Sequence, residues 1–378
     1  MSEKISTVYI KKVKDYNDPY LLNAVAELLD ASGLSWNKKT VLLKPNMLSP
    51  ANNNLAVTTH PAVLEAAVLH LQKSAKKVFF GDSPGIPLSP YFVMKKLGYQ
   101  NILKKTKALF TDFDKDKQIV NNKNNRLVKS FTLARIVVET DILINLPKMK
   151  THVGAIYSGA VKNLFGCIPG LIKAKFHFRF PTRKHFGILL ADCASTVEAD
   201  FHIMDAIIAM EGEGPSNGKP VNQSLILASK DPVALDAVCC SIMGLNPKTV
   251  PHLVEAEKSG LGTLELNKIK IEGVKNLEDV TVKVYENRSS KKEMRFGPAG
   301  IAQKVLKNLL LAKPVILEER CKKCQLCVKI CPITAISSVD NGVPKIDYNK
   351  CFRCYCCHEI CPEHAIIKKD TLLSKIIG

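Results

Sequence analysis

The segment CKKCQLCVKICP, from Cys321 to Pro332, and the segment CFRCYCCHEICP, from Cys351 to Pro362, decide how the last part of this chain folds. Both segments have the spacing C-x2-C-x2-C-x3-C-P. Cysteines two residues apart in a tight loop can reach three iron atoms of one [4Fe-4S] cubane, and the fourth cysteine, at the start of a helix, turns towards the other cluster. The doubled spacing therefore predicts two [4Fe-4S] clusters with crossed ligand sets.

The crossed arrangement assigns each cysteine of the two spacings to a cluster. We expect one cluster to be held by Cys321, Cys324, Cys327 and Cys361, and the other by Cys351, Cys354, Cys357 and Cys331. Cys356 departs from the spacing, and either replaces Cys357 as a ligand or stays a free thiol; the regular spacing favours Cys357. Because C-x2-C pairs also bind zinc, a structural zinc site is the alternative. Residues 315–370 resemble the bacterial-type ferredoxins with two [4Fe-4S] clusters, which implies a small α+β domain that carries electrons.

The composition indicates a globular chain with more than one domain. Its 378 residues, 46% of them hydrophobic, exceed the size at which a single core usually stops growing. Nine of the thirteen cysteines lie between Cys321 and Cys361, which favours metal ligation in a reducing compartment over a disulfide framework. No apolar run reaches the roughly 20 residues of a membrane span, and the start lacks the apolar stretch of a signal peptide. We therefore expect a cytoplasmic location.

The formal net charge of +19 admits several classes of partner. Nucleic acid, an acidic membrane surface, an acidic protein and an anionic small molecule would all match it. Lysines are spread along the whole chain without a compact basic arm or an aromatic and basic RNA-binding motif, so we do not expect nucleic acid. A redox partner protein and an anionic small molecule are the expected partners, and the sequence carries no signal for the oligomeric state.

Upstream of the cysteines, apolar runs alternate with segments of helical spacing. The strand-like runs are Thr40–Lys44, Lys77–Gly81, Ile136–Leu146, Phe201–Met210 and Ser224–Ser229, and the helical ones are Pro61–Ser74, Phe186–Ala199 and Pro232–Met243. The alternation predicts an α/β domain with a mostly parallel, helix-covered sheet. The expected division is an α/β domain over residues 1–286, a connector with a short helix over 287–314, the two-cluster domain over 315–370, and a tail over 371–378.

Polar clusters follow several of these runs. They are Lys44-Pro-Asn-Met, Gly81-Asp-Ser-Pro-Gly, Leu146-Pro-Lys-Met-Lys-Thr-His, Gly159–Gly170 and Glu211-Gly-Glu-Gly-Pro. With the helix start Asp231-Pro-Val-Ala-Leu-Asp, they resemble the family called domain of unknown function 362 across most of residues 1–290. Such domains are often fused to a ferredoxin module of this kind. The resemblance implies the domain arrangement but no established reaction. The type of reaction therefore has to be inferred from the side chains in these clusters.

The candidate catalytic residues are Lys148, Lys150, His152 and Lys162. They combine ammonium groups with an imidazole at the end of an apolar strand, and more cations follow at Lys173, Lys175, Arg179 and Arg183. Ligands bind beyond the carboxyl ends of strands in such sheets. An anionic ligand, carboxylate or phosphate, with proton transfer by the imidazole suits this combination. A solvated basic face is the alternative.

The same segment has a fainter similarity to the nickel-pincer lactate racemases. That family has a histidine, then Ser-Gly-Gly, a lysine and Pro-Gly, and here His152, Ser158-Gly-Ala, Lys162 and Pro169-Gly follow in this order. The resemblance implies that Lys162 would tether a nicotinic-acid-derived cofactor and that His152 would act as a base. Ala160 replaces the second glycine, and the family's other histidines have no clear counterpart, which puts the shared cofactor in doubt.

Further polar residues at strand ends are candidates for substrate binding. Lys44 and Asn46 would contribute a charge and an amide, Asp82 a cation ligand or a base, and Glu211 a carboxylate. For each of these, a loop or an ordinary turn competes with the functional interpretation. Asp231 before Pro232 has the arrangement of a helix N-cap. The remaining cysteines considered, Cys167, Cys239 and Cys240, are expected to be buried and packed.

The favoured function is an iron-sulfur oxidoreductase that moves electrons through two [4Fe-4S] clusters to or from an anionic molecule or a further cofactor in the α/β domain. The first alternative is a non-catalytic electron-transfer or docking module. The second is a non-redox enzyme, racemase-like or ligase-like, whose clusters are structural. The chain has no Gly-x-Gly-x-x-Gly fingerprint and no Walker A loop, so no motif points to a nicotinamide cofactor or ATP.

Overall fold

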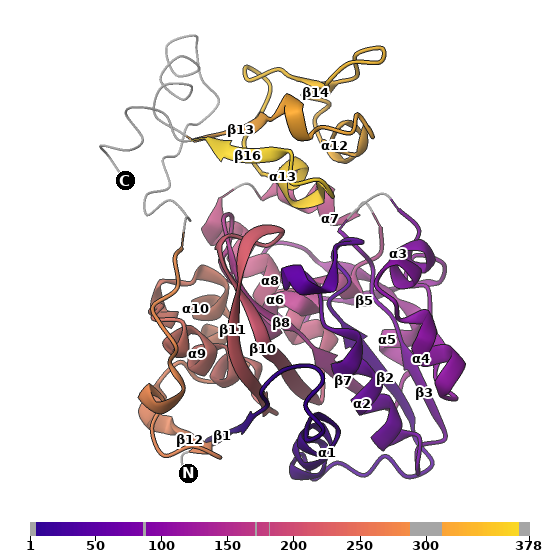
Figure 1. Ribbon diagram of the computed structural model, residues 1–378, viewed down its shortest axis with the longest axis vertical. Helices are drawn as coiled ribbons and strands as arrows, with labels where there is room; N and C mark the ends of the chain where they lie inside the picture. The colour runs from indigo at the N-terminus through magenta and orange to yellow at the C-terminus, as the bar shows by residue number, and fades with distance from the viewer. Residues whose placement is uncertain (1–4, 86–87, 171, 181, 288–311, 370–378) are drawn as a thin grey trace.

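The computed structural model describes residues 5–85, 88–170, 172–180, 182–287 and 312–369 (Figure 1). The expected connector falls almost entirely on residues 288–311 and, with its short helix, lies outside the described residues, as does the tail. The strands are β1 (Ser6–Lys12), β2 (Thr40–Pro45), β3 (Lys77–Phe80), β4 (Leu109–Phe110), β5 (Lys117–Asn121), β6 (Ser130–Ala134), β7 (Ile142–Leu146), β8 (Lys148–His152), β9 (Ile156–Ser158), β10 (Phe201–Glu213), β11 (Asn217–Ser229), β12 (Ile269–Glu272), β13 (Lys313–Ile316), β14 (Ile336–Ser337), β15 (Lys345–Ile346) and β16 (Ile366–Lys369). The helices are α1 (Leu21–Ala31), α2 (Pro61–Leu71), α3 (Pro90–Lys96), α4 (Gln100–Lys105), α5 (Arg135–Glu139), α6 (Ala160–Asn163), α7 (Ile172–Arg179), α8 (Arg183–Val197), α9 (Pro232–Ile242), α10 (Pro251–Lys258), α12 (Leu326–Ile330) and α13 (Cys356–Ile360).

A ten-stranded, mostly parallel sheet organises the large domain, as the sequence predicts. Its order is β12-β1-β11-β10-β7-β2-β3-β4, with β8 paired to β10 and β9. Side chains of β2 alternate between two cores: Leu42 packs with α8, α9 and α10, whereas Val41 and Leu43 pack with α1 and α2. Parallel strands covered on both faces have to be apolar on both sides, which explains the continuous apolar runs.

Two strand expectations needed correction. The run expected over Ile136–Leu146 is divided, because helix α5 ends at Glu139 and only Ile142–Leu146 forms strand β7. The runs at 201–210 and 224–229 belong to longer strands, β10 and β11, which pair antiparallel as a hairpin. The hairpin is the main antiparallel part of the sheet, and its turn reaches the C-terminal module (Figure 1).

Helix α9 starts as its sequence predicts. The Asp231 carboxylate accepts hydrogen bonds from the backbone N–H groups of Val233 and Ala234, both at 2.8 Å, and Pro232 occupies the first turn. This satisfies two of the amides that a helix start leaves without partners. Cys239 and Cys240, within α9, and Cys167 are fully buried, as expected. Asp231 and these thiols therefore have structural roles.

The C-terminal module is small and internally repeated. Helices α12 and α13 occupy equivalent places in the two cysteine segments, and both begin after a residue with positive φ, Gln325 at 61° and Tyr355 at 62°. Two short antiparallel strand pairs, β13 with β16 and β14 with β15, complete it. The module is the α+β domain that the sequence predicts.

Candidate functional site

Two cavities in the C-terminal module gather the cysteines in the crossed sets. The first, of about 350 Å³, is lined by Cys321, Cys324, Cys327 and Cys361. The second, also of about 350 Å³, is lined by Cys331, Cys351, Cys354, Cys356 and Cys357. In each cavity, three of the cysteines in the C-x2-C-x2-C-x3-C spacing come from one segment and the fourth, Cys361 or Cys331, comes from the other. This is the arrangement expected of two cubanes.

The surroundings of the thiols fit iron-sulfur clusters. The Sγ atoms of Cys331 and Cys361 each accept a hydrogen bond at 3.2 Å from a backbone N–H group, that of Ala335 or Ala365. Hydrogen bonds to sulfur and burial are the means by which proteins tune such clusters.

A third and larger cavity, of about 740 Å³, lies between the large domain and the C-terminal module. We call it the interdomain cavity. The large domain lines it with Asn46, Leu48, Asp82, Ser83, Gly85, Ser158, Lys162, Asn163, Phe165, Gly166, Gly170, Lys173, Ala174 and His177, and the module with Ile330, Cys356 and Glu359. Asn46 and Asp82 directly follow the carboxyl ends of β2 and β3, where ligands bind in sheets of this class. Cys356 belongs to this cavity and to the second cysteine cavity at once.

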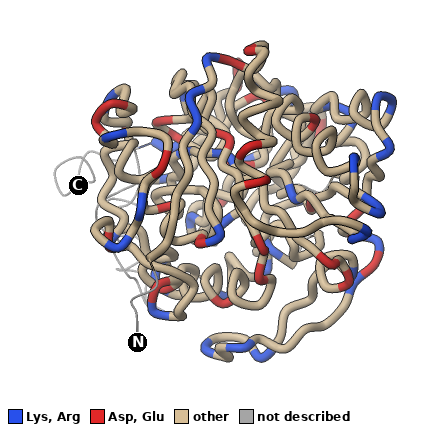
Figure 2. The backbone as a smooth tube through the Cα atoms, turned by 90° about the horizontal axis from the view of Figure 1, so that it is seen from below, with Lys and Arg blue, Asp and Glu red and all other residues tan. Residues whose placement is uncertain are grey.

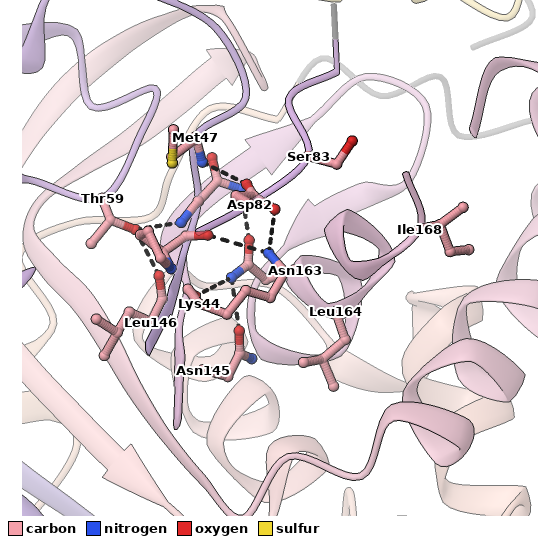
Figure 3. Close-up of polar contacts among 12 residues, drawn as sticks. Lys44, Met47, Thr59, Asp82, Ser83, Asn145, Leu146, Asn163, Leu164 and Ile168 are labelled. Carbon is pink, nitrogen blue, oxygen red and sulfur yellow. Dashed lines mark hydrogen bonds and ion pairs between the residues drawn. The ribbon is translucent and has the colours of Figure 1, made fainter. Parts of the chain in front are cut away.

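Lys44 and Asp82 form a buried ion pair at the wall of this cavity. Lys44 Nζ lies 2.7 Å from Asp82 Oδ1, and both side chains are almost completely buried. Asp82 Oδ2 also accepts a hydrogen bond from the Met47 N–H group at 2.8 Å (Figure 3). A Cβ atom at Gly166 would lie 2.2 Å from Asp82 Oδ1 and 2.7 Å from Lys44 Nζ, so only glycine allows the backbone to pass here. The two predicted binding residues therefore act together, and Lys44 is neutralised by its partner.

Amide side chains connect the cavity to the sheet (Figure 3). Asn163 accepts a hydrogen bond from Asn46 Nδ2 at 2.9 Å and donates one to Asn145 Oδ1 at 2.8 Å. Lys150 Nζ donates to Val57 O at 2.6 Å and to Asn46 Oδ1 at 3.3 Å. Burial and the neighbouring Lys162 charge hold the pKa of Lys150 well below its usual value. The chain of amides fixes the orientation of Asn46, whose side chain lines the cavity.

His152 faces the C-terminal module. Its Nδ1 accepts hydrogen bonds from the backbone N–H groups of Gly154 and Ala155, at 3.0 and 3.1 Å. Burial and the charge of Lys162 hold the pKa of His152 well below its usual value, so the ring is neutral. Because Nδ1 accepts, the proton is on Nε2, which lies 3.3 Å from Glu359 Oε1. In this tautomer Nε2 of His152 can donate a hydrogen bond, and Nδ1 is already engaged as an acceptor.

Lys162 is the cation that the cavity leaves without a charge partner. It lines the cavity, and no hydrogen bond or ion pair joins its ammonium group to any described residue. Burial lowers its pKa, with the carboxylate of Glu359 acting in the opposite direction. Lys173, also on the wall, donates to Ser83 O, Ser83 Oγ and Ile168 O, and burial lowers its pKa to about 8. Lys162 is therefore the candidate cation for an anion in this cavity, whose wall also carries the carboxylate of Glu359.

Of the eight predicted residues, Asn46, Asp82 and Lys162 line the cavity, Lys44, Lys150 and His152 lie close behind these or at the module, and Lys148 and Glu211 lie elsewhere. Lys148 forms a fully buried ion pair with Asp205 at 2.9 Å and donates to Tyr16 Oη at 2.6 Å. Glu211, near the end of β10, forms an ion pair with Lys283 at 2.6 Å and accepts from the Glu286 N–H group. Neither residue lines the interdomain cavity. Local partners thus satisfy both charges away from the expected site.

The sequence did not single out Ser83, His177 or Glu359 as parts of the site. Ser83 stands in an ordinary turn sequence, and His177 lies among the basic residues of α7, so neither was singled out. Glu359 stands between Cys357 and Cys361, where the cysteines dominate the pattern. One signal was available in the sequence. The first cysteine segment has a basic residue, Lys329, at the position where the second segment has the acidic Glu359.

Comparisons with known proteins match two separate parts of the chain. The model of the family described as domain of unknown function (DUF362) matches residues 41–241, and that of the 4Fe-4S binding domain matches residues 314–337. The C-terminal part is therefore an iron-sulfur module.

A thylakoid-associated protein of Synechocystis sp. is 32% identical over 262 residues, which cover 68% of this chain and 80% of the relative. Among solved structures, the lactate racemase apoprotein of Thermoanaerobacterium thermosaccharolyticum aligns with a TM-score of 0.41 at 13% identity, over 65% of this chain and 58% of that one. A protein from Thermotoga maritima aligns with a TM-score of 0.40 at 14% identity, over 60% and 59%. The family match and the Synechocystis relative show that this chain belongs to the DUF362 family.

Proposed function

We propose that this protein is an iron-sulfur oxidoreductase that moves electrons through two [4Fe-4S] clusters to or from a small organic anion bound in the interdomain cavity. One observation carries the proposal: the cavity that contains the unpaired Lys162 has the cluster-binding helix α13 as part of its wall. The anion and the electron carrier would thus be neighbours. A cluster supplies single-electron transfer, and the chain's own residues would bind and orient the anion.

The two cysteine cavities support the proposed count of two clusters. In this proposal Cys321, Cys324, Cys327 and Cys361 hold the first cluster, and Cys351, Cys354, Cys357 and Cys331 hold the second. Cys356 stays a thiol beside the second cluster, because it also lines the interdomain cavity whereas Cys357 does not.

The charges around the interdomain cavity support an anionic ligand. Lys44 is paired with Asp82, and Lys173 and Lys150 are held by neutral oxygens. The ammonium group of Lys162 is left to donate charge-assisted hydrogen bonds to a carboxylate or phosphate. Phe165 and Leu48 provide apolar wall for the rest of a small molecule. The wall therefore combines many polar and charged groups with a smaller apolar part, as a site for a small polar molecule would.

Partners and location complete the proposal. A redox partner protein is proposed because the module needs an electron donor or acceptor. Basic residues are interspersed with acidic ones in the view of Figure 2, in keeping with the expectation that nucleic acid is not a partner. No helix of the described residues is long and apolar enough to cross a membrane. The cytoplasmic location stays a prediction, beside a relative that is named thylakoid-associated.

The test uses anaerobically purified protein. Iron, sulfide, zinc and nickel are quantified, and electron paramagnetic resonance (EPR) is recorded before and after dithionite; about eight irons per chain are expected for two cubanes. The reduced protein is then mixed with a panel of small carboxylates and phosphates, and cluster reoxidation is followed by absorbance. We expect one class of anion to reoxidise the clusters, and Lys162→Met to slow this step.

The matched control is Lys175→Met, which removes an exposed lysine of α7 that does not line the cavity. Equal rates in the two variants would argue against Lys162 as the anion-binding group. Reducible clusters that no anion reoxidises would favour the electron-transfer or docking module. A reaction that persists in folded protein carrying Cys324→Ser and Cys354→Ser would favour the non-redox enzyme.

A further inference from the structure

The two cysteine cavities differ in what surrounds them. The first includes Cys324, which is exposed, and the neighbouring Lys322 and Lys323 are exposed as well. The second includes Cys356 and Cys357, both buried, and Cys356 also lines the interdomain cavity. The first cysteine cavity thus has a solvent-exposed cysteine, Cys324, and the second is adjacent to the proposed binding site.

Helices α12 and α13, which are equivalent in the internal repeat, show the same contrast between a solvent-exposed side and a side that faces the interdomain cavity. In α12, Leu326 and Lys329 occupy the positions that Cys356 and Glu359 occupy in α13. Lys329 is exposed, whereas Glu359 lies in the wall of the interdomain cavity. If the two clusters were equivalent, the two helices would not be expected to differ at these positions. Because they differ, α13 presents polar side chains to the interdomain cavity, whereas α12 contributes Ile330 to its wall.

Contacts with the large domain are concentrated near α13. Ser216 Oγ donates to Glu359 O at 2.7 Å, and His152 Nε2 lies 3.3 Å from Glu359 Oε1. Asn217 Nδ2 donates to Ile366 O at 2.8 Å, just beyond the second segment. These contacts come from the turn of the β10–β11 hairpin and from β8. These polar contacts hold the second cluster segment against the large domain, whereas the first segment contributes Leu326 and Ile330 to an apolar cluster of that domain.

We propose that the second cluster is the one that exchanges electrons with the interdomain cavity, and that the first cluster exchanges them with a partner electron-transfer protein at the Cys324 edge. When the partner is the donor, its reduced centre loses one electron and the first cluster gains it. The same electron then passes to the second cluster and to the cavity occupant, and no bond forms or breaks between protein groups. The inference rests on the proposed function for the presence of two clusters and of a cavity ligand.

The test is a redox titration followed by EPR on anaerobic, cluster-loaded protein. Cys324→Ser and Cys354→Ser alter the ligands of one cluster each, and so assign the two signals. Lys162→Met removes a positive charge from the cavity wall, which disfavours the added electron on a nearby cluster. We expect the reduction equilibrium of the second cluster to become less favourable by a factor on the order of three to ten, for one unit charge across a small cavity.

The control Lys175→Met should leave both clusters unchanged, because that lysine is exposed. A shift confined to the first cluster, an equal shift of both, or no shift in Lys162→Met would each overturn the inference. The redox titration and the reoxidation experiment can give different answers, so a failure of this inference can be distinguished from a failure of the proposed function. If the second cluster alone shifts but no anion reoxidises it, the order of the clusters stands and the proposed anionic substrate does not.

Discussion

Lys148 offers a direct test of whether a buried lysine of this domain serves stability or chemistry. Its ammonium group pairs with Asp205 at 2.9 Å, and both side chains are completely buried. Lys148→Met keeps most of the side chain's apolar length but leaves Asp205 as an uncompensated buried charge. Removing one member of a buried pair costs about 3–5 kcal/mol. Asp205 keeps hydrogen bonds from Tyr16 Oη and the His60 N–H group, so we expect the lower end, about 3 kcal/mol.

The assay is urea unfolding followed by fluorescence. Trp36 is the single tryptophan of the chain and packs in the core of the large domain, so its emission reports that domain alone. With a urea dependence of about 3 kcal/mol/M, the loss moves the midpoint down by about 1 M. The double variant Lys148→Met with Asp205→Leu should recover part of the loss, because an apolar pair replaces the buried ion pair.

Lys39→Met is the control, since Lys39 pairs with Asp141 at 3.6 Å on the surface and its loss should leave the midpoint unchanged. An unchanged midpoint in Lys148→Met, together with loss of anion-dependent cluster reoxidation, would refute the structural role and return Lys148 to the candidate catalytic residues.

Three further predictions follow from the site and the core. Cys357→Ser should lower the iron content of anaerobic protein from about eight per chain, whereas Cys356→Ser should keep it; the opposite result would make Cys356 the ligand. Burial lowers the pKa of Lys173 to about 8, so anion affinity measured by calorimetry should fall as the pH rises through 8, and a flat profile would contradict a charged Lys173 at the site. Burial also lowers the pKa values of His202 and His252 to about 3, so the unfolded chain binds more protons than the folded one between about pH 6.5 and 3. The unfolding free energy should therefore decrease on acidification by up to about 1.4 kcal/mol per pH unit for each histidine, and a constant value in urea titrations would show that these rings are not held neutral.

Local patterns predicted much of the fold. The apolar runs at β2, β3 and β7 signalled a buried parallel sheet because such strands are covered on both faces. The Asp231-Pro pair signalled the start of α9 because capping depends on adjacent residues. The division at α5 was missed because Ile136, Val137 and Val138 are β-branched in one helical turn, and tertiary packing overrode their preference for strands.

The site was predictable only in part, since its geometry depends on contacts distant in sequence. Lys44 and Asp82 were both identified, but nothing local indicates that they neutralise each other. His152 was identified as titratable, but its tautomer depends on the following turn, and its partner Glu359 comes from the other domain. Asn145 reads as an ordinary strand residue, although it anchors the amides that orient Asn46.

The division of one cavity wall between two domains bears on whether the parts are interchangeable. A ferredoxin domain from another protein, grafted after residue 312, would bring two clusters and the same cysteine spacing. It would lack the side chains of Cys356 and Glu359 on the face that meets β8 and the β10–β11 turn. Such a chimera would still contain two clusters, but the interdomain cavity would lack these two side chains in its wall. The two halves of this chain are therefore expected to have been inherited as a matched pair rather than assembled from exchangeable modules.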